Sequence, residues 1–207
     1  MKTKVVKVII VDDHPLVLSG FEFILANSTE ITLRGSFTSS HDALDFLSAE
    51  FVDIVLMDIN LPGINGIDTT EIIKKKYDNI HVIAISNLNE QSIAKRMLSV
   101  GASGYLLKNV SAEELINAIK DVMDDQVVLS KEMDLVLKNK KDPVPAISQR
   151  EREVLALMSK GYTTPKIAEL MFISPLTVES HRRNLLQKFA VSNSASLIHK
   201  ATQMKFI

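Results

Sequence analysis

The chain has 207 residues, 46% of them hydrophobic and 24% charged, which is the composition of a folded globular protein and excludes a disordered or fibrous one. It contains no cysteine, which excludes disulfides, thiolate zinc sites and thiol nucleophiles and is consistent with a cytoplasmic location; no apolar run approaches the roughly 18 residues of a membrane span. The net charge of −1 is the sum of an acidic and a basic part of the chain. Residues 1–125 contain 11 Lys and Arg against 18 Asp and Glu, whereas residues 126–207 contain 13 Lys and Arg against 7 Asp and Glu. The two parts are therefore expected to have different partners.

The first 125 residues alternate short apolar runs with longer amphipathic stretches. The expected strands cover residues 8–11, 32–36, 54–57, 82–85 and 104–107, and the expected helices cover residues 15–26, 41–49, 66–76, 90–100 and 112–123. Three of the runs, VIIV, IVLM and VIAI, are almost wholly apolar, which is typical of strands that are buried on both faces of a parallel sheet. This pattern predicts a doubly wound α/β domain with five parallel strands.

The remaining residues show helical patterns and no convincing strand. A short helix over 131–138 precedes KNKKDPVPAI, whose lysines and prolines are typical of a linker. Capping boxes are expected at Ser111 with Glu114, in the last helix of the first part, and at Ser148 with Glu151. The second box begins a helix that ends at Gly161, and helices starting at Thr164-Pro165, at Ser174-Pro175 and near residue 193 are expected to follow.

Polar residues follow the predicted strands of the first domain at their carboxyl ends. Asp12 and Asp13 follow the first strand, Asp58 the third, Ser86 the fourth and Lys108 the fifth. Because ligands bind beyond the carboxyl ends of strands in such sheets, these side chains are expected to share one pocket. Three carboxylates require a compensating cation, and Mg²⁺ with Lys108 supplies it, so the pocket suits attack by an aspartate on a phosphoryl group.

The segments VIIVDDH, IVLMDINLPGINGI, VIAIS and GYLLK together resemble the receiver domain of two-component systems over residues 5–125. The resemblance implies that Asp58 is the phospho-acceptor, and that Lys108 contacts the phosphoryl group. It implies that Ser86 and Tyr105 form a switch pair which remodels the face around the fourth helix. The implied ligands of Mg²⁺ are Asp12, Asp13, Asp58 and the backbone carbonyl of Asn60. Asn109 departs from the family, because many receivers have proline there.

Other interpretations of the acidic residues remain open. Paired aspartates after a strand are often only a helix N-cap, and Ser86 or Tyr105 alone is more often a structural residue. His14 beside two carboxylates suggests a transition-metal site, although no second histidine has ligand spacing. A Mg²⁺-dependent phosphatase with an aspartyl intermediate would use the same pocket, but Asn60 stands where its general acid is expected.

Residues 148–189 give the order helix, short helix, tight turn and longer helix, which is typical of a helix-turn-helix DNA-binding unit. In the longer helix Val178, His181, Leu185 and Phe189 recur at helical spacing and are expected to face the core, leaving the opposite side for the major groove. The alternative is an ordinary solvated helix in a small bundle.

An ordered set of residues between Glu151 and His181 resembles the LuxR-type domain of NarL/FixJ response regulators, over residues 147–205. The resemblance implies four helices, of which the third contacts bases and the last supports dimerisation. The residues implied at the DNA are Glu179, Ser180 and Arg183 at bases, and Ser174, Thr177, Arg182 and Lys188 at the backbone. Glu179 departs from a frequent lysine, where it repels phosphate or accepts a hydrogen bond from cytosine.

These observations predict a receiver at residues 1–125, a linker at 126–146 and a DNA-binding domain at 147–207. The predicted protein is a response regulator and not an enzyme with its own substrate: phosphorylation of Asp58 controls dimerisation and transcription. Its expected partners are a histidine kinase, double-stranded promoter DNA and, when it is phosphorylated, a second copy of the chain, with no membrane partner. A DNA-binding protein whose receiver is never phosphorylated is the remaining alternative.

Overall fold

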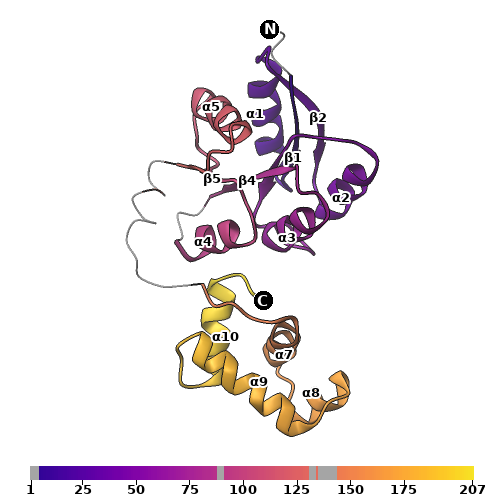
Figure 1. Ribbon diagram of the computed structural model, residues 1–207, viewed down its shortest axis with the longest axis vertical. Coiled ribbons are helices and arrows are strands. Elements are labelled where there is room, and N and C mark those ends of the chain that lie inside the picture. The colour runs from indigo at the N-terminus through magenta and orange to yellow at the C-terminus, as the bar shows by residue number, and fades with distance from the viewer. Residues whose placement is uncertain (1–4, 88–90, 131–133, 135–143) are drawn as a thin grey trace. The chain divides into compact units, whose positions relative to one another are not determined.

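The computed structural model describes residues 5–87, 91–130, 134 and 144–207, and the chain divides into two units at residues 1–140 and 141–207 (Figure 1). The first unit is a parallel sheet flanked by helices. Its strands are β1 (Val6–Val11), β2 (Ile31–Phe37), β3 (Ile54–Asp58), β4 (His81–Ser86), β5 (Gly104–Leu107) and β6 (Val128–Leu129). Its helices are α1 (Pro15–Ala26), α2 (Ser40–Ala49), α3 (Gly66–Lys76), α4 (Gln91–Ser99) and α5 (Ala112–Met123).

The strand order is β2-β1-β3-β4-β5-β6, and neighbouring strands in it are parallel. The chain moves outward from β1 to β2, then crosses back to β3 on the other side of β1. β1 and β3 therefore lie side by side at the point where the strand order reverses, which is where doubly wound sheets bind their ligands.

Alternate residues of the strands pack into separate cores on the two faces of the sheet. On one face, Val8 and Ile10 of β1 share a hydrophobic cluster with residues of α1 and α5. On the opposite face, Ile9 and Val11 pack with residues of α2 and α3, and Tyr105 packs with α4. Figure 1 shows α1 and α5 on one side of the sheet and α2, α3 and α4 on the other. The apolar runs are thus buried on both faces, as predicted.

The sheet has six strands, so the prediction of five was one short. The additional strand is β6, in which Val128 and Leu129 pair with Gly104 and Tyr105 of β5. Two residues are too few to show any periodicity, and this strand exists only because β5 offers an unpaired edge. The helix predicted over 131–138 lies outside the described residues, except for position 134, which is helical.

The second unit consists, in its described part, of four helices around one core. They are α7 (Gln149–Ser159), α8 (Thr164–Met171), α9 (Pro175–Lys188) and α10 (Ser194–Gln203). Val178 and Leu185 of α9 and Phe189, directly after the helix, are buried in that core, whereas His181 is only half-buried. None of the described helices in either unit combines the length and the apolarity that a bilayer-spanning segment needs.

Capping residues fix where these helices begin. The capping box predicted at Ser148 is present: its hydroxyl accepts from the Glu151 backbone N–H, and the Glu151 carboxylate accepts from the Ser148 N–H at 2.7 Å. At Ser111 the hydroxyl accepts from the Glu114 N–H, and the reciprocal bond of the predicted box is not formed. Ser174 caps α9 by accepting from the Thr177 N–H. Each side chain satisfies a donor that the first turn of a helix leaves unpaired.

Candidate functional site

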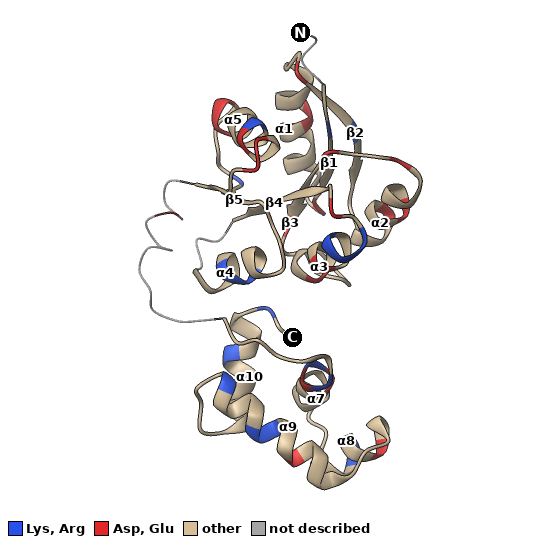
Figure 2. Ribbon diagram, in the orientation of Figure 1, with Lys and Arg blue, Asp and Glu red and all other residues tan. Residues whose placement is uncertain are grey.

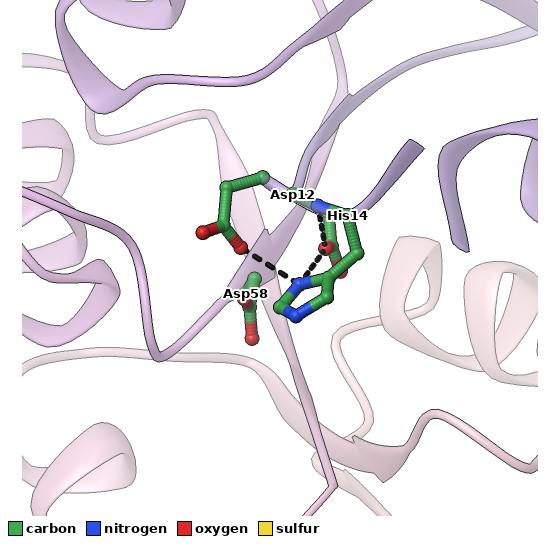
Figure 3. A group of neighbouring side chains, drawn as sticks. Asp12, His14 and Asp58 are labelled. Carbon is green, nitrogen blue, oxygen red and sulfur yellow. Dashed lines mark hydrogen bonds and ion pairs between the residues drawn. The ribbon is translucent and has the colours of Figure 1, made fainter. Parts of the chain in front are cut away.

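The acidic pocket lies at the carboxyl ends of β1 and β3. The two strands pair in register from Val8↔Ile54 to Val11↔Met57, so the next residues along them are Asp12 and Asp58. Both aspartates are 1% exposed. Figure 3 shows their side chains beside the ring of His14. The sheet topology therefore brings together carboxylates that are 46 positions apart in the sequence, as predicted.

Lys108 joins the two buried carboxylates. Its Nζ lies 2.6 Å from Asp12 Oδ2 and 3.2 Å from Asp58 Oδ2, and its side chain is 6% exposed. The residue follows β5, two strands away from β3, and its backbone N–H donates to the Ser86 carbonyl at 2.8 Å. This backbone bond holds the loop after β5 against the end of β4, so that the ammonium reaches across to both aspartates.

Asp13 and His14 complete the pocket. The Nδ1 of His14 lies 2.7 Å from Asp13 Oδ1 and 3.1 Å from Asp12 Oδ1, and its backbone N–H donates to Asp12 Oδ1 at 2.9 Å. One ligand atom from each of Asp12, Asp13, His14 and Asp58 lies within 4.8 Å of the others. The geometry thus places His14 among the carboxylates, although its side chain is 56% exposed.

The charge balance of the pocket favours an added cation. Burial, followed by the neighbouring Asp12 carboxylate, raises the pKa of Asp58 above its ordinary value, although Lys108 opposes the shift. One ammonium therefore does not compensate the three carboxylates. Asp58 Oδ1 is also buried without a hydrogen-bond partner among the described residues. Carboxylate oxygens grouped in this way form the donor set of a hard divalent cation.

The loop after β3 brings the start of α3 against the backbone of Asp58. The Gly66 N–H donates to the Ile59 carbonyl at 3.1 Å, and the Asn65 side chain caps α3 by accepting from two backbone N–H groups. A Cβ built on Gly66 would lie 1.9 Å from the Asp58 carbonyl oxygen, which no side chain tolerates. Asn60, which lies between Asp58 and Gly66 in the sequence, is exposed at the surface of the loop. Glycine at position 66 is therefore required for this close approach.

The two predicted switch residues are buried on neighbouring strands. Ser86, at the end of β4, is 1% exposed, and Tyr105 of β5 is fully buried. The Tyr105 side chain shares a hydrophobic cluster with Ile93 and Met97 of α4. A change at the end of β4 can therefore reach α4 through packed side chains.

One buried ion pair, between α3 and α4, was not predicted from the sequence. Arg96 of α4 is 1% exposed, and its Nη2 lies 3.0 Å from Oδ1 of Asp68 in α3. In the sequence, Arg96 occupies an ordinary helical position among residues of mixed polarity and carries no signal of burial. The pair joins α3, which begins beside Asp58, to α4.

The exposed face of α9 carries most of the residues predicted at DNA. Ser174, Thr177, Glu179, Ser180 and Arg183 are all exposed, while the opposite face of the helix is buried. A helix whose exposed face carries polar and basic groups, and which follows a short helix and a turn, fits the width of the major groove.

Two of the predicted DNA contacts have partners inside the protein. The Arg182 guanidinium donates to the hydroxyls of Thr164 in α8 and Ser194 in α10, at 2.5 and 3.0 Å. The Lys188 Nζ donates to Oε2 of Glu151, a buried residue of α7, at 2.6 Å. Both side chains therefore tie α9 to the other helices.

Two family models match the chain. Residues 8–120 match the model described as response regulator receiver domain, and residues 145–201 match the model described as bacterial regulatory proteins, luxR family. The first match covers more than half of the chain and includes the whole acidic pocket, while the second includes the exposed face of α9.

Several curated proteins are similar along their full length. The transcriptional regulatory protein MctR of Rhizobium johnstonii is 31% identical, over 95% of this chain and 92% of that protein. The response regulator protein VraR of Staphylococcus saprophyticus is 30% identical, over 98% of this chain and 99% of that protein. Among solved structures, a complex of the two-component response regulator RcsB with DNA is 25% identical, with a TM-score of 0.66, over 96% of this chain and 98% of that one.

Proposed function

The chain belongs to the NarL/FixJ family of response regulators, which join a receiver domain to a luxR-family DNA-binding domain, and we propose that phosphorylation of Asp58 controls its binding to promoter DNA. The observation that carries the proposal is the buried group of Asp12, Asp58 and Lys108, whose charges meet at the ends of three strands. We place the receiver at residues 1–125, the linker at 126–146 and the DNA-binding domain at 147–207. The protein regulates transcription within a two-component system and has no separate enzymatic substrate.

In the proposed phosphotransfer, a carboxylate oxygen of Asp58 bonds to the phosphorus of a phosphohistidine on the partner kinase. The bond between phosphorus and the imidazole nitrogen breaks, and that nitrogen takes up a proton. The Lys108 ammonium, 3.2 Å from Asp58 Oδ2, stabilises the negative charge that gathers on the phosphoryl oxygens. The close approach of Gly66 to the Asp58 carbonyl oxygen packs the start of α3 against the Asp58 backbone and supports its position.

Asp12, Asp13 and Asp58, with the backbone carbonyl of Asn60, would hold Mg²⁺. When bound, a magnesium ion neutralises the carboxylates and polarises the phosphoryl oxygens. The grouping of the carboxylate oxygens and the raised pKa of Asp58 support this assignment. His14, at the rim of the group, holds Asp12 and Asp13 in place through its ring and its backbone N–H.

Phosphorylation acts on the rest of the receiver through the two switch residues. A phosphoryl group adds negative charge and acceptor oxygens at Asp58, and the Ser86 hydroxyl is placed at the end of the adjacent strand to donate to one of them. Movement of this strand end changes the packing of Tyr105 against α4. The result is a two-state receiver that favours dimerisation when it is phosphorylated.

In the DNA-binding domain, α9 is the recognition helix. Its exposed residues Glu179, Ser180 and Arg183 contact DNA bases. Ser174 and Thr177, at its start, contact the sugar-phosphate backbone of the DNA. Arg182 and Lys188 keep their protein partners and support the orientation of α9. A dimer reads two half-sites about one turn of DNA apart.

The test of the proposal is phosphorylation by acetyl phosphate with Mg²⁺, followed by intact-protein mass spectrometry. The wild-type chain should gain one phosphoryl group, and the Asp58→Asn variant should gain none because its amide is not a nucleophile. Asp45→Asn, at an exposed position of α2, is the matched control and should be modified like the wild type. Equal modification of Asp58→Asn would contradict the proposal.

The regulatory step has its own measurement. With Mg²⁺ and beryllofluoride, a mimic of the phosphoryl group, the wild-type chain should shift toward a dimer in sedimentation experiments and bind DNA more tightly. Asp58→Asn should show neither change. If beryllofluoride changes neither the sedimenting mass of the protein nor its affinity for DNA, the receiver does not control the DNA-binding domain in the proposed way.

A further inference from the structure

The exposed face of α9 has one feature that phosphate binding does not explain. Leu176, Glu179, Ser180 and Arg183 follow the spacing of one helical stripe, and all four are exposed. Glu179 is the one acidic residue among residues 175–188, which include the basic residues Arg182, Arg183 and Lys188, and Figure 2 shows both signs of charge on α9. A carboxylate in this position repels DNA phosphates, so Glu179 does not serve as a contact to the DNA backbone.

The structure holds this carboxylate in a defined orientation. The Thr164 hydroxyl of α8 donates to Glu179 Oε1 at 2.5 Å, and Arg182 Nη1 lies 3.7 Å from the same oxygen. Arg182 in turn donates to Thr164 and to Ser194 of α10. Residues of three helices therefore fix Oε1. Oε2 has no hydrogen-bond partner among the described residues and the side chain is 50% exposed, so Oε2 can accept a further hydrogen bond. Because the side chain is already ordered, little conformational entropy is lost on binding.

Among the groups that DNA presents in the major groove, only amino groups donate to a carboxylate. These groups are N4 of cytosine and N6 of adenine. Beside the adenine amino group lies the N7 acceptor, which repels a second carboxylate oxygen, whereas the neighbour of cytosine N4 is a C–H group. Cytosine is therefore the base that accommodates a glutamate without an opposing acceptor.

We propose that Glu179 is a specificity-determining residue, which selects cytosine at one position of each half-site by accepting a hydrogen bond from its N4 amino group. This inference rests on the proposed function, because it requires α9 to lie in the major groove. It goes beyond that function by naming the base. The expected preference for cytosine over the other bases at that position is about tenfold.

The experiment is selection of binding sites from duplex DNA with a randomised segment, using the full-length protein with Mg²⁺ and beryllofluoride. The wild type should enrich sites with an invariant cytosine in each half-site. Glu179→Gln should lose that preference and favour adenine, because a glutamine amide pairs with adenine N6 and N7. The sites selected by the two proteins are compared position by position.

Gln187→Lys supplies the matched control. It changes the net charge by the same single unit as Glu179→Gln, at an exposed position two turns further along α9. This variant should bind all DNA more tightly and keep the cytosine preference of the wild type. Circular dichroism confirms that each variant is folded, which is expected because both side chains are exposed.

The outcomes separate the inference from the function on which it rests. If the wild type enriches no sequence at all, both the DNA-binding function and the inference fail. If the wild type and Glu179→Gln select the same bases, DNA binding stands and the role of Glu179 is overturned. A loss of cytosine in Gln187→Lys as well would also overturn it, because the effect would then follow charge and not position.

Discussion

At the residue scale, the acidic pocket carries charges that oppose folding. Asp58 is buried beside Asp12, and both burial and repulsion disfavour its ionised form, as the raised pKa of Asp58 indicates. When the pKa of an acid is higher in the folded than in the unfolded chain, the protein loses stability as the pH rises from the unfolded pKa to the folded pKa. At neutral pH the ionised Asp58 therefore destabilises the receiver, and the proposed phosphotransfer accounts for a carboxylate at this position because it requires one.

Neutralising this residue should stabilise the protein. We predict that Asp58→Asn raises the free energy of unfolding of the receiver by about 1 kcal/mol at neutral pH, in the absence of divalent cations. Urea denaturation in the presence of a chelator measures the change. Mg²⁺ should stabilise the wild type and have little effect on the variant. A less stable variant would mean that the contact with Lys108 outweighs burial and repulsion.

The close approach at Gly66 gives a second prediction. Gly66→Ala places a Cβ 1.9 Å from the Asp58 carbonyl oxygen, so the loop must shift, and we expect a loss of at least about 2 kcal/mol in unfolding free energy together with slower phosphorylation. Gly20→Ala is the control, because nothing lies within 4 Å of its added Cβ and it stands inside α1. That variant should gain about 0.5 to 1 kcal/mol. Unchanged phosphorylation of Gly66→Ala would contradict the role assigned to the loop.

At the element scale, local chemistry determines where most of the helices lie. α1, α3 and α5 have the predicted bounds, because proline, asparagine and serine mark their first turns and apolar spacing marks their buried faces. β6 was missed, since its pairing depends on the edge of β5 and not on its own two residues. The pocket residues were predicted because their strands end at one edge of the sheet. The protein partners of Arg182 and Lys188 were not, because they lie on other helices, 12 to 37 positions away in the sequence.

The ion pair between α7 and α9 predicts a pH dependence. Although burial opposes it, hydrogen bonds from Lys188 and Ser148 lower the pKa of Glu151 below its ordinary value of 4.5. An acid whose pKa is lower in the folded than in the unfolded chain contributes stability that is present above its unfolded pKa. This stability is lost as the pH falls from about 4.5 through the pKa of the folded state. Glu151→Gln keeps an acceptor for the Ser148 N–H but loses the charge, and should cost about 2 kcal/mol at neutral pH.

Thermal or urea unfolding of the second unit at several pH values measures this effect. The difference between the wild type and Glu151→Gln should shrink as the pH falls below about 4.5, because the carboxylate is then protonated first in the unfolded chain and, at still lower pH, in the folded protein. Glu153→Gln is the control, since its pair with Arg150 is more exposed, and it should change stability by less than about 0.5 kcal/mol. A constant difference across the pH range would exclude the ion pair as its cause.

At the scale of the whole molecule, opposite charge and separate cores distinguish the two units. The hydrophobic cluster of the second unit is made of residues 144–207 alone, and the clusters around the sheet are made of residues up to 129. Residues 141–207 contain 10 Lys and Arg against 5 Asp and Glu, while residues 1–125 are strongly acidic. An acidic receiver repels DNA, whereas the basic unit attracts it, so DNA affinity belongs to one unit and its control to the other.

Because the second unit has its own core, the fragment 141–207 should fold alone, with a cooperative helical unfolding transition, and bind double-stranded DNA without the receiver. Each phosphate that it neutralises releases counterions, so contact with about three phosphates should weaken binding by roughly 40-fold when the salt concentration rises fourfold. Fluorescence anisotropy with labelled duplexes measures this slope, and Arg183→Ala should both reduce it and weaken binding. The fragment 1–125 is the control and should bind no DNA. Binding that does not respond to salt, or that needs the receiver fragment to be present, would show that the charge of the second unit does not provide the affinity.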